Sequence, residues 1–581
     1  MSTDLLSQNF TTLVTAPQGI PRLRELILQL AVQGKLTTQD PADETAGVLL
    51  KRIEKEKTRL IVNGDIKRTD SFLEVATDEY NYEIPNGWKW TRIGNLVANS
   101  KQDIVDGPFG SDLHSNEYVD FGVPVIRLQN VQRNEFINKN IRFITSEKAE
   151  YLSRHNFVAG DILITKLGDP VGKACIVPDY LKYGIFVADI IRLRLNSQFL
   201  DARYINFMIN SPFISSKFNG LIKGITRQRV NLTKVREMVI PLPPLAEQHR
   251  IVEKVDRLMV LCDTLDDQQR KEHEQQIRHG TAALAALQNA KDLEEVEKWW
   301  RHIAKRFDLI LNCLENITVL RSTILQLAVK GQLGTNDPTE DYAGIILERI
   351  KSLKGDEDPA TSIENACIKK YQIPKNWILC RLGDILIFGP KNGVSPVPVD
   401  FKTSTKSLAL SATSSGKFLP QFYKYIDLEF EADSHIWLSK GDILVQRSNT
   451  EDYVGIAAVY EGNPNEFVYP DLMMKIVIHP NIDYKYIHIC INNPISREFI
   501  RDRAVGTSSS MKKINQDILR DLCIPLPPLA EQHRIVAMVD ALMALCDKLE
   551  AQIREREAAQ ERFAKAIINK IVNAPISTVQ T

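Results

Sequence analysis

The sequence predicts an α+β protein with two globular domains separated by long antiparallel coiled-coil helices, organised as a pseudo-twofold internal repeat. The first observation is the stretch IPLPPLAEQHRIV at residues 240–252, which returns letter for letter at residues 524–536, an offset of 284 residues. The second is a coiled-coil pattern of apolar residues after each copy. The third is that the residues in front of the two copies differ. At 581 residues the chain also exceeds what one core supports.

Composition limits the class of protein but not its partners. The hydrophobic content of 44% and the charged content of 25% are those of a soluble globular protein. Lys+Arg and Asp+Glu both number 73, so a nucleic-acid surface would have to arise from local clustering. The eight cysteines show no CxxC or zinc spacing, which argues against a metal site. With no signal peptide and no run of 18 apolar residues, we expect a cytoplasmic location without membrane contact.

A helix opens each half of the chain. Ile20, Leu23, Ile27 and Leu30 recur at helical spacing, and Gly34 is a natural stop. The stretch at 27–36 returns at 324–333, an offset of 297 residues. Both copies continue through Asp-Pro into a second helix, around residues 50–55 and 347–352.

The regions between these helices and the repeated motif are the variable parts. They open on matched segments, Tyr82–Trp88 and Tyr371–Trp377. Residues 89–238 and 378–522 then share only a sparse skeleton, such as 156–164 with 437–445. Short β-branched runs bounded by Gly, Pro and Asp predict strands in a compact α+β domain.

A long helix follows each copy of the motif. Ile251, Val255, Leu258, Cys262 and Leu265 step by four and three residues, and the second copy does the same. The first helix would run from Leu245 for about 43 residues and span about 65 Å. We expect it to pair with 317–352, and 529–572 to pair with 20–57, which gives a dumbbell. Cys262 and Cys546 would be small buried hydrophobes.

Two further assignments complete the organisation. The Trp299-Trp300 pair in the connector 289–316 is either an interface anchor or, the favoured alternative, ordinary core packing. The predicted domains are an N-terminal arm and helical region (1–80), a first globular domain (81–243), a central coiled-coil spacer (244–370), a second globular domain (371–527) and a C-terminal coiled-coil helix (528–581).

Catalytic motifs are missing from the sequence. Gly168–Ala174 resembles a phosphate-binding loop but has the wrong glycine spacing and an alanine after the lysine. Pro470-Asp471 before Lys475 could be forced into a nuclease pattern, but the first half has no counterpart. Glu247, His249, Glu531 and His533 could be acid/base groups, although structure or partner contact is the better explanation.

These motifs carry a resemblance to a known family. A duplicated IPLPPLAEQ-x-x-IV after a variable domain, followed by a coiled-coil helix, resembles the specificity (S) subunit of type I restriction–modification systems. The ILQLAV-x-G-x-L repeat resembles the other half of that family's helical spacer. The resemblance covers the whole chain. The helical arm ahead of the first variable domain departs from members that begin at that domain.

The resemblance implies a function. Each variable region would be a target-recognition domain that reads one half of a bipartite asymmetric target in double-stranded DNA, and the helices would set the spacing. Two modification (methyltransferase) subunits would dock on the helices, and restriction (motor/endonuclease) subunits would join them. The resemblance also implies that this chain is not an enzyme but supplies specificity only, which agrees with the missing catalytic motifs. No cofactor is then expected on this chain, whereas S-adenosylmethionine, ATP and Mg are expected on the partners. The alternatives are a coiled-coil adaptor that binds protein only and a chain with its own nuclease or methyltransferase activity.

Candidate DNA contacts lie mainly in front of each repeated motif, where a glycine-started loop carries basic and amide side chains. Arg suits guanine, Gln and Asn suit adenine, and Lys suits phosphate. The aligned Asn231 and Asn515 are either helix caps or base readers, with caps favoured. The candidates are Lys223, Thr226, Arg227, Gln228, Arg229 and Asn231 in the first half, Ser508, Ser509, Ser510, Lys512, Lys513 and Asn515 in the second, and, as weaker ones, Arg127, Gln129, Asn130, Lys166 and Arg447.

Overall fold

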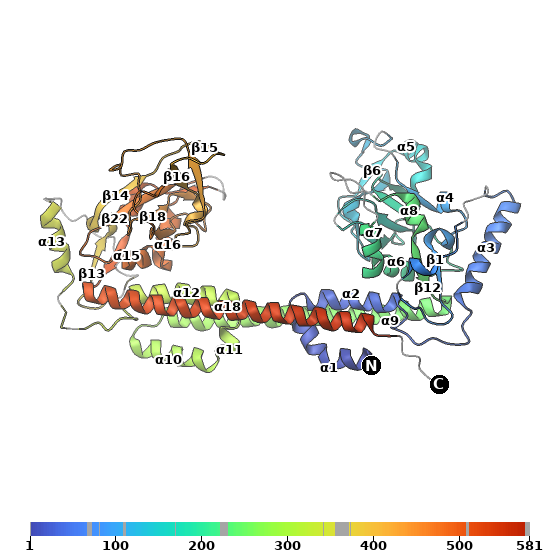
Figure 1. Ribbon diagram of the computed structural model, residues 1–581, viewed down its shortest axis with the longest axis horizontal. Helices are drawn as coiled ribbons and strands as arrows, with labels where there is room; N and C mark the ends of the chain where they lie inside the picture. Colours follow the sequence, from blue (N-terminus) through green and yellow to red (C-terminus); the bar gives the residue numbers. More distant parts are fainter. Residues whose placement is uncertain are drawn as a thin grey trace. The chain divides into compact units, whose positions relative to one another are not determined.

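The computed structural model divides the chain into two compact units, each described by itself (Figure 1). Unit 1 comprises Met1–Lys271 and Glu557–Thr581, and unit 2 comprises Glu272–Arg556. The structure describes all residues except 1, 67–71, 81, 109–111, 169, 221–229, 338, 341, 355–370, 372, 507–510 and 576–581.

The helical part of unit 1 is built from segments at both ends of the chain and in its middle. Helix α2 packs in one core with the start of α9 and the end of α18, and Arg22 forms a 2.5 Å ion pair with Glu561. The predicted coiled-coil pattern of apolar residues in α9 is confirmed, because Ile251, Val255 and Cys262 are buried. The elements are α1 (Ser2–Thr15), α2 (Gly19–Val32), α3 (Ala46–Val62), α9 (Leu245–Gln288) up to residue 271, and α18 (Leu529–Asn573) from residue 557.

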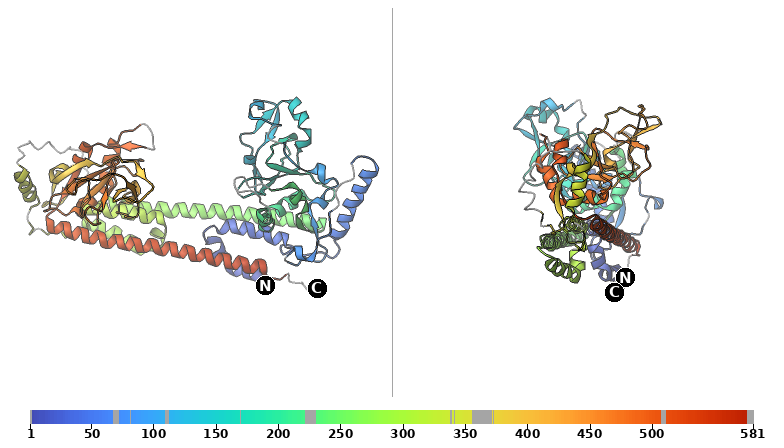
Figure 2. Two further views of the ribbon diagram at one scale, coloured as in Figure 1. Left: turned by 45° about the horizontal axis from the view of Figure 1, so that its top comes forward. Right: turned by 90° about the vertical axis from the view of Figure 1, so that its left-hand side faces the viewer.

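The globular part of unit 1 contains two four-stranded sheets, ordered β6-β3-β10-β7 and β2-β11-β8-β9, and the short pairs β1-β12 and β4-β5 (Figure 2). The strands are β1 (Lys89–Arg92), β2 (Ile104–Asp106), β3 (Val123–Ile126), β4 (Val131–Gln132), β5 (Glu135–Phe136), β6 (Arg142–Ile144), β7 (Asn156–Val158), β8 (Ile162–Thr165), β9 (Ala174–Ile176), β10 (Tyr183–Phe186), β11 (Ile190–Leu193) and β12 (Val239–Leu242). The helices are α4 (Ser100–Asp103), α5 (Ser146–Tyr151), α6 (Ala202–Asn210), α7 (Pro212–Gly220) and α8 (Leu232–Glu237).

Unit 2 repeats this plan. Its four-stranded sheets are ordered β14-β22-β18-β20 and β15-β17-β16-β21. The strands are β13 (Ile378–Arg381), β14 (Leu386–Asn392), β15 (Pro398–Val399), β16 (Thr405–Leu408), β17 (Tyr423–Ile426), β18 (Ile443–Gln446), β19 (Ser448–Asn449), β20 (Ala457–Val459), β21 (Phe467–Val468), β22 (Met473–Ile478), β23 (Lys512–Lys513) and β24 (Cys523–Leu526). The helices are α10 (Leu293–Lys305), α11 (Phe307–Ile310), α12 (Leu314–Val329), α13 (Gly344–Lys354), α15 (Tyr484–Asn492), α16 (Pro494–Arg503) and α17 (Gln516–Arg520), with parts of α9 and α18.

Each globular part begins and ends on one pair of antiparallel strands. Lys89 of β1 faces Leu242 of β12, and Ile378 of β13 faces Leu526 of β24 in the same register. The exit strand of each pair leads directly into the Pro-rich entry of a long helix. The repeated motif is therefore the point where a globular part and a long helix are joined.

The predicted spacer pairing is right for the first helix of each half and wrong for the second. Helix α2 packs with the end of α18 in unit 1, and α12 packs with the end of α9 in unit 2. Gly34 and Gly331 then adopt left-handed φ angles of 67° and 70°, which end a helix and turn the chain. Helices α3 and α13 leave the spacer and pack on the globular parts, at the short helices η2 (Ile93–Leu96) and η6 (Leu382–Ile385).

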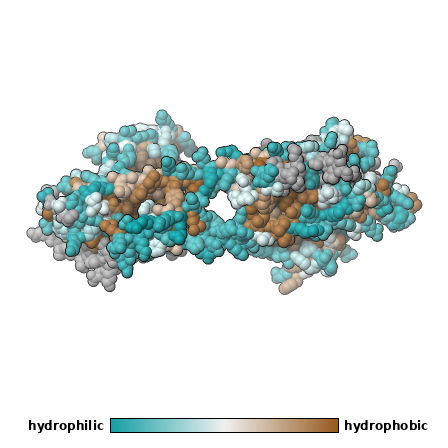
Figure 3. Space-filling model, turned by 90° about the horizontal axis from the view of Figure 1, so that it is seen from below, coloured by the Kyte–Doolittle hydropathy of each residue, from teal (hydrophilic) through white to brown (hydrophobic). Residues whose placement is uncertain are grey.

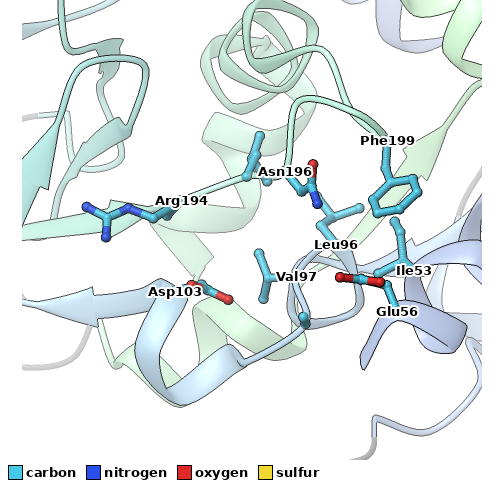
Figure 4. A pocket seen from close by; sticks show the side chains of 10 residues that line it. Ile53, Glu56, Leu96, Val97, Asp103, Arg194, Asn196 and Phe199 are labelled. Carbon is cyan, nitrogen blue, oxygen red and sulfur yellow. The ribbon is translucent and has the colours of Figure 1, made fainter. Parts of the chain in front are cut away.

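Figure 4 shows how α3 meets the globular part of unit 1. A cavity of about 200 Å³ remains between them. Burial raises the pKa of the Asp103 carboxyl at its edge, and Arg194 pairs with Asp161 at 2.7 Å. The cavity is lined by Ile53, Glu56, Leu96, Val97, Ala98, Asp103, Arg194, Leu195, Asn196 and Phe199.

The described residues can be compared with the expectations for membrane spans, metal sites and cysteines. No helix among them is long and apolar enough to cross a membrane. They contain no cluster of His, Cys, Asp and Glu side chains suited to a metal ion. Their cysteines are free and buried, which confirms the prediction for Cys262 and Cys546.

Candidate nucleic-acid interface

Glu247 of the repeated motif ties three segments of unit 1 together. Its side chain is 1% exposed. The carboxylate accepts hydrogen bonds from Trp88 Nε1 at 2.8 Å, Thr37 Oγ1 at 3.0 Å and Gln39 Nε2 at 3.0 Å. Burial raises the pKa of Glu247, and these hydrogen bonds oppose the rise. The start of α9, the loop after α2 and the residue just before strand β1 are therefore held together by one buried acid.

The next residues of the motif are engaged in the same joint. The Gln248 side chain accepts from the backbone N–H of Asp201 at 3.0 Å and donates to the carbonyl of Pro243 at 3.0 Å. Arg250 pairs with Asp43 at 2.5 Å. His249 is largely exposed, and its Nε2 lies 3.8 Å from an Asp201 carboxylate oxygen. These contacts give Glu247, Gln248 and Arg250 a structural role in the joint, with no need of a role in catalysis.

Unit 2 builds the joint from the same motif with one difference. Glu531 accepts from Thr335 Oγ1 at 3.1 Å and from the backbone N–H of Asn336 at 3.1 Å, and it also pairs with Arg534. Gln532 accepts from the backbone N–H of Asp483 at 2.9 Å, as Gln248 does from that of Asp201. The indole N–H of Trp377 is buried and has no acceptor among the described residues, whereas that of Trp88 reaches Glu247.

The aligned asparagines both cap a helix. Asn231 accepts from the backbone N–H of Thr233 at 2.8 Å at the start of α8. Asn515 accepts from that of Ile518 at 2.9 Å at the start of α17. These bonds favour the capping alternative for both residues. Several predicted contacts lie outside the described residues: Lys223, Thr226, Arg227, Gln228, Arg229, Ser508, Ser509 and Ser510.

Lys166 and Arg447 occupy equivalent places in the two units, which the sequence analysis missed. Lys166 follows β8, and its carbonyl accepts from the backbone N–H of Val230 at 3.2 Å. Arg447 follows β18, and its carbonyl accepts from that of Ile514 at 3.0 Å. The signal was present, because the match of 156–164 with 437–445 also aligns these two residues. Each unit thus holds a basic residue beside the residue that directly precedes the capping asparagine.

The side chains of the two equivalent residues have different neighbours. Lys166 Nζ pairs with Asp106 at 2.6 Å. Arg447 donates from its guanidinium to the carbonyl of Asp471 at 3.3 Å. The two units therefore present different charge patterns at one position of a shared frame.

Asn130 organises the turn that carries Arg127 and Gln129. Its side chain is fully buried, accepts from the backbone N–H of Arg127 at 3.0 Å and donates to the carbonyls of Ile137 and Lys139 at 2.8 and 2.9 Å. Arg127 donates to the carbonyl of Asn140 at 2.7 Å, and Gln129 is exposed. The structure therefore places Asn130 as a support for its neighbours.

The side chain of Gln446, at the end of β18, connects a turn and a short strand of unit 2. This residue was not among the candidates from the sequence. Its fully buried side chain donates to the Leu410 carbonyl at 3.1 Å, Thr413 Oγ1 at 3.1 Å and Ser414 Oγ at 2.9 Å, and accepts from Asn449 Nδ2 at 2.6 Å. Asn449 belongs to β19, which pairs with Lys512 and Lys513 of β23. One buried amide thus links a turn to β19, the strand whose partner β23 carries two predicted contacts.

Comparison with known proteins gives one family. The family model described as "Type I restriction modification DNA specificity domain" matches residues 87–275 and 374–556. The chain is 29% identical to the type I restriction enzyme EcoEI specificity subunit of Escherichia coli, over 96% of this chain and 94% of that protein. It is also 29% identical to the EcoAI specificity subunit of the same species, over 96% and 94% of the two chains.

A solved structure described as "Structural basis underlying complex assembly and conformational transition of the type I R-M system" contains a similar chain. The match covers 85% of this chain and 99% of that one, with 17% identity and a TM-score of 0.48.

Proposed function

Because this chain belongs to the type I restriction modification DNA specificity family, we propose that it is the DNA-binding specificity subunit of a type I restriction–modification complex. Each globular part reads one half of a bipartite asymmetric target in double-stranded DNA. The helices between them set the spacing of the halves. The curated relatives named above, matched over nearly their whole length, are specificity subunits, which supports this proposal.

The observation that carries the proposal is the contrast between the joints and the candidate contacts. Glu247 and Gln248 have the same kind of buried contacts as Glu531 and Gln532. At the equivalent positions after β8 and β18, in contrast, one unit presents Lys166 with Asp106 and the other presents Arg447. The matched joints thus hold two globular parts whose polar surfaces differ, as two readers of different half-sites require, while Lys166 and Arg447 themselves would position the DNA through its phosphates.

The partners follow from the same proposal. Two modification (methyltransferase) subunits dock on the two repeated helical regions, and restriction (motor/endonuclease) subunits complete the assembly. S-adenosylmethionine, ATP and Mg are bound by those partners, and this chain supplies recognition without catalysis. The five parts predicted from the sequence, from the N-terminal arm (1–80) to the C-terminal helix (528–581), and a cytoplasmic location belong to this proposal.

The test is a map of N6-methyladenine across the genome of a host that expresses this chain with its modification subunit. We expect methylation at a bipartite motif with a fixed gap. Exchanging residues 81–243 for the equivalent domain of a relative is expected to change one half of the motif and leave the other half and the gap unchanged. A single continuous motif contradicts the spacer role. A complex that forms without any sequence preference shows an adaptor, and methylation by this chain alone shows an enzyme.

A further inference from the structure

Helix α10 of unit 2 exposes an apolar stripe beside the face that it buries. Val296, Trp299 and Ile303 pack on the core of unit 2. Trp300 is 43% exposed, and Leu293, seven residues earlier, is 57% exposed. This resolves the Trp299-Trp300 pair, because one indole packs on the core while its neighbour faces outward.

The stripe continues beyond the end of α10. Phe307 and Leu309 of α11 are 41% and 49% exposed. Leu293 and Trp300 are separated by seven residues, a spacing that keeps side chains on one face of a helix, and Phe307 and Leu309 follow in the next helix, after α10 ends at Lys305. Figure 3, seen from below, shows apolar residues gathered in patches among hydrophilic ones. A contiguous apolar surface rimmed by polar residues marks an interaction site.

The charges beside this stripe are sorted along the helix. The first half carries the acids Glu294, Glu295 and Glu297, and the second half carries the bases Lys298, Arg301 and Lys305. Glu297 and Arg301 pair with each other at 2.9 Å, yet their side chains are 66% and 67% exposed. At 100° per residue both lie next to Trp300 on its solvent side.

Such a helix is complementary to a copy of itself turned end to end. In an antiparallel pair about a twofold axis beside Trp300, the acidic half of each helix faces the basic half of the other. The same axis brings Leu293 of each copy toward the C-terminal end of α10 in the other copy, where α11 begins. The helix dipoles also oppose favourably in this arrangement.

We propose that α10 and α11 form a self-association surface, through which two copies of this chain pair isologously. The surface is small, because a helix of 13 residues is about 20 Å long. A stable specific interface buries about 1,200 to 2,000 Å² in total. The pairing is therefore weak, concentration-dependent and sensitive to salt, as expected of an encounter between two complexes rather than a permanent dimer.

The test is sedimentation velocity of the full chain in its complex with the modification subunit, at several concentrations. Wild-type complexes are expected to show reversible dimerisation that weakens as salt rises. Glu297→Lys and Arg301→Glu each place like charges across the twofold axis, so each variant alone is expected to lose self-association at least tenfold. An equimolar mixture of the two variants is expected to recover it, because the opposite charges then meet between different copies.

The mixture separates self-pairing from damage to the helix. Each single variant breaks the Glu297–Arg301 ion pair within its own α10. Mixing the two variants cannot restore that pair, because both of its members belong to one chain. The matched control is the exposed Asp267–Arg270 pair on α9, beyond the repeated apolar pattern, which has similar exposure. Asp267→Lys and Arg270→Glu are expected to leave self-association unchanged.

A monomeric wild-type complex at every concentration overturns the proposal, and so does a mixture that stays monomeric. Loss of self-association in the α9 variants also overturns it. If Trp300→Ala abolishes binding of the modification subunit instead, the stripe belongs to that partner, and the proposal falls while the proposed function stands.

Discussion

The indole N–H of Trp88 donates a 2.8 Å hydrogen bond to the carboxylate of Glu247, whereas Trp377, the equivalent residue of unit 2, has no acceptor for its indole N–H among the described residues. Trp88 lies just before the first globular strand, and Glu247 lies in the first turn of the long helix. This bond therefore fixes the globular part to the helix. The two copies of the motif have the same sequence and form equivalent joints. Among the described residues, the tryptophan indole donates a hydrogen bond to the motif glutamate in unit 1 but not in unit 2.

The two tryptophans make a matched pair of variants. Trp88→Phe removes a donor to a buried acid, which is expected to cost about 1–3 kcal/mol of stability. Trp377→Phe removes the same atoms where the donor has no acceptor, so its cost is expected to be clearly smaller. Denaturant unfolding of the two variants measures the difference. Equal losses contradict a specific role for the Trp88–Glu247 bond.

The pH dependence of stability follows from the buried acid. Burial raises the pKa of Glu247 in the folded chain above its usual value of 4.5. Above pH 4.5 the folded state then holds more protons than the unfolded state, so this group's contribution to stability falls as pH rises through the raised pKa. Glu247→Gln is expected to remove this negative slope, measured by unfolding from pH 4 to 8. An unchanged slope in the variant rules Glu247 out as its source.

The sequence alone predicted the joints and long helices better than it predicted the surfaces of the globular parts. An exact repeat and an apolar heptad pattern predicted the long helices, because burial of Ile251, Val255 and Cys262 leaves a regular trace in the chain. The departure of α3 and α13 from the spacer was missed, since both still show the helical apolar pattern. Their buried residues pack on a globular part whose position no local pattern encodes.

The candidate DNA contacts show the same limit: a role that depends on a distant segment leaves no local pattern in the sequence. The capping role of Asn231 and Asn515 was anticipated, because two readers of different sequences are not expected to share one base contact. Gln446 was missed, because its role comes from a turn more than thirty residues earlier in the chain. Lys166 and Arg447 were selected separately, although the aligned skeleton already placed them at equivalent positions.

Lys166 and Arg447 are predicted to contact phosphates in equivalent places. Each substitution by alanine is expected to lower the slope of log K against log salt by about 0.9, the value for one phosphate contact. Fluorescence anisotropy with the cognate duplex at several salt concentrations measures this slope. The same loss on non-specific DNA is expected, because phosphate contacts carry no sequence information. A change confined to the cognate duplex shows base reading instead.

Arg227 and Arg229 lie outside the described residues, and their role stays a prediction from the sequence. The double substitution by alanine is expected to weaken DNA binding and to reduce its salt dependence. Lys234→Ala, which removes a largely exposed base paired with Glu237 on α8, serves as the control and is expected to have little effect. Unchanged affinity and slope in the double variant rule out this segment as a contact.

Gln446 and Thr165 are aligned at the ends of β18 and β8 and provide a test of half-site reading. Gln446→Ala leaves buried Thr413 and half-buried Leu410 and Asn449 without these hydrogen bonds. The contacts of Thr165 are fewer, since its hydroxyl accepts from the backbone N–H of Lys173 at 2.9 Å. The loss in unit 2 is expected to cost about 1–3 kcal/mol of discrimination, confined to one half of the target.

Methylation of duplexes that carry single substitutions in either half measures this directly. Gln446→Ala is expected to relax one half only, and Thr165→Ala is expected to act, more weakly, on the other half. The reason is that each residue supports the loops of its own unit, and the two units have separate cores. If both variants relax the same half, the assignment of one unit to each half is wrong. If Gln446→Ala lowers methylation of all duplexes equally, this amide supports folding rather than reading.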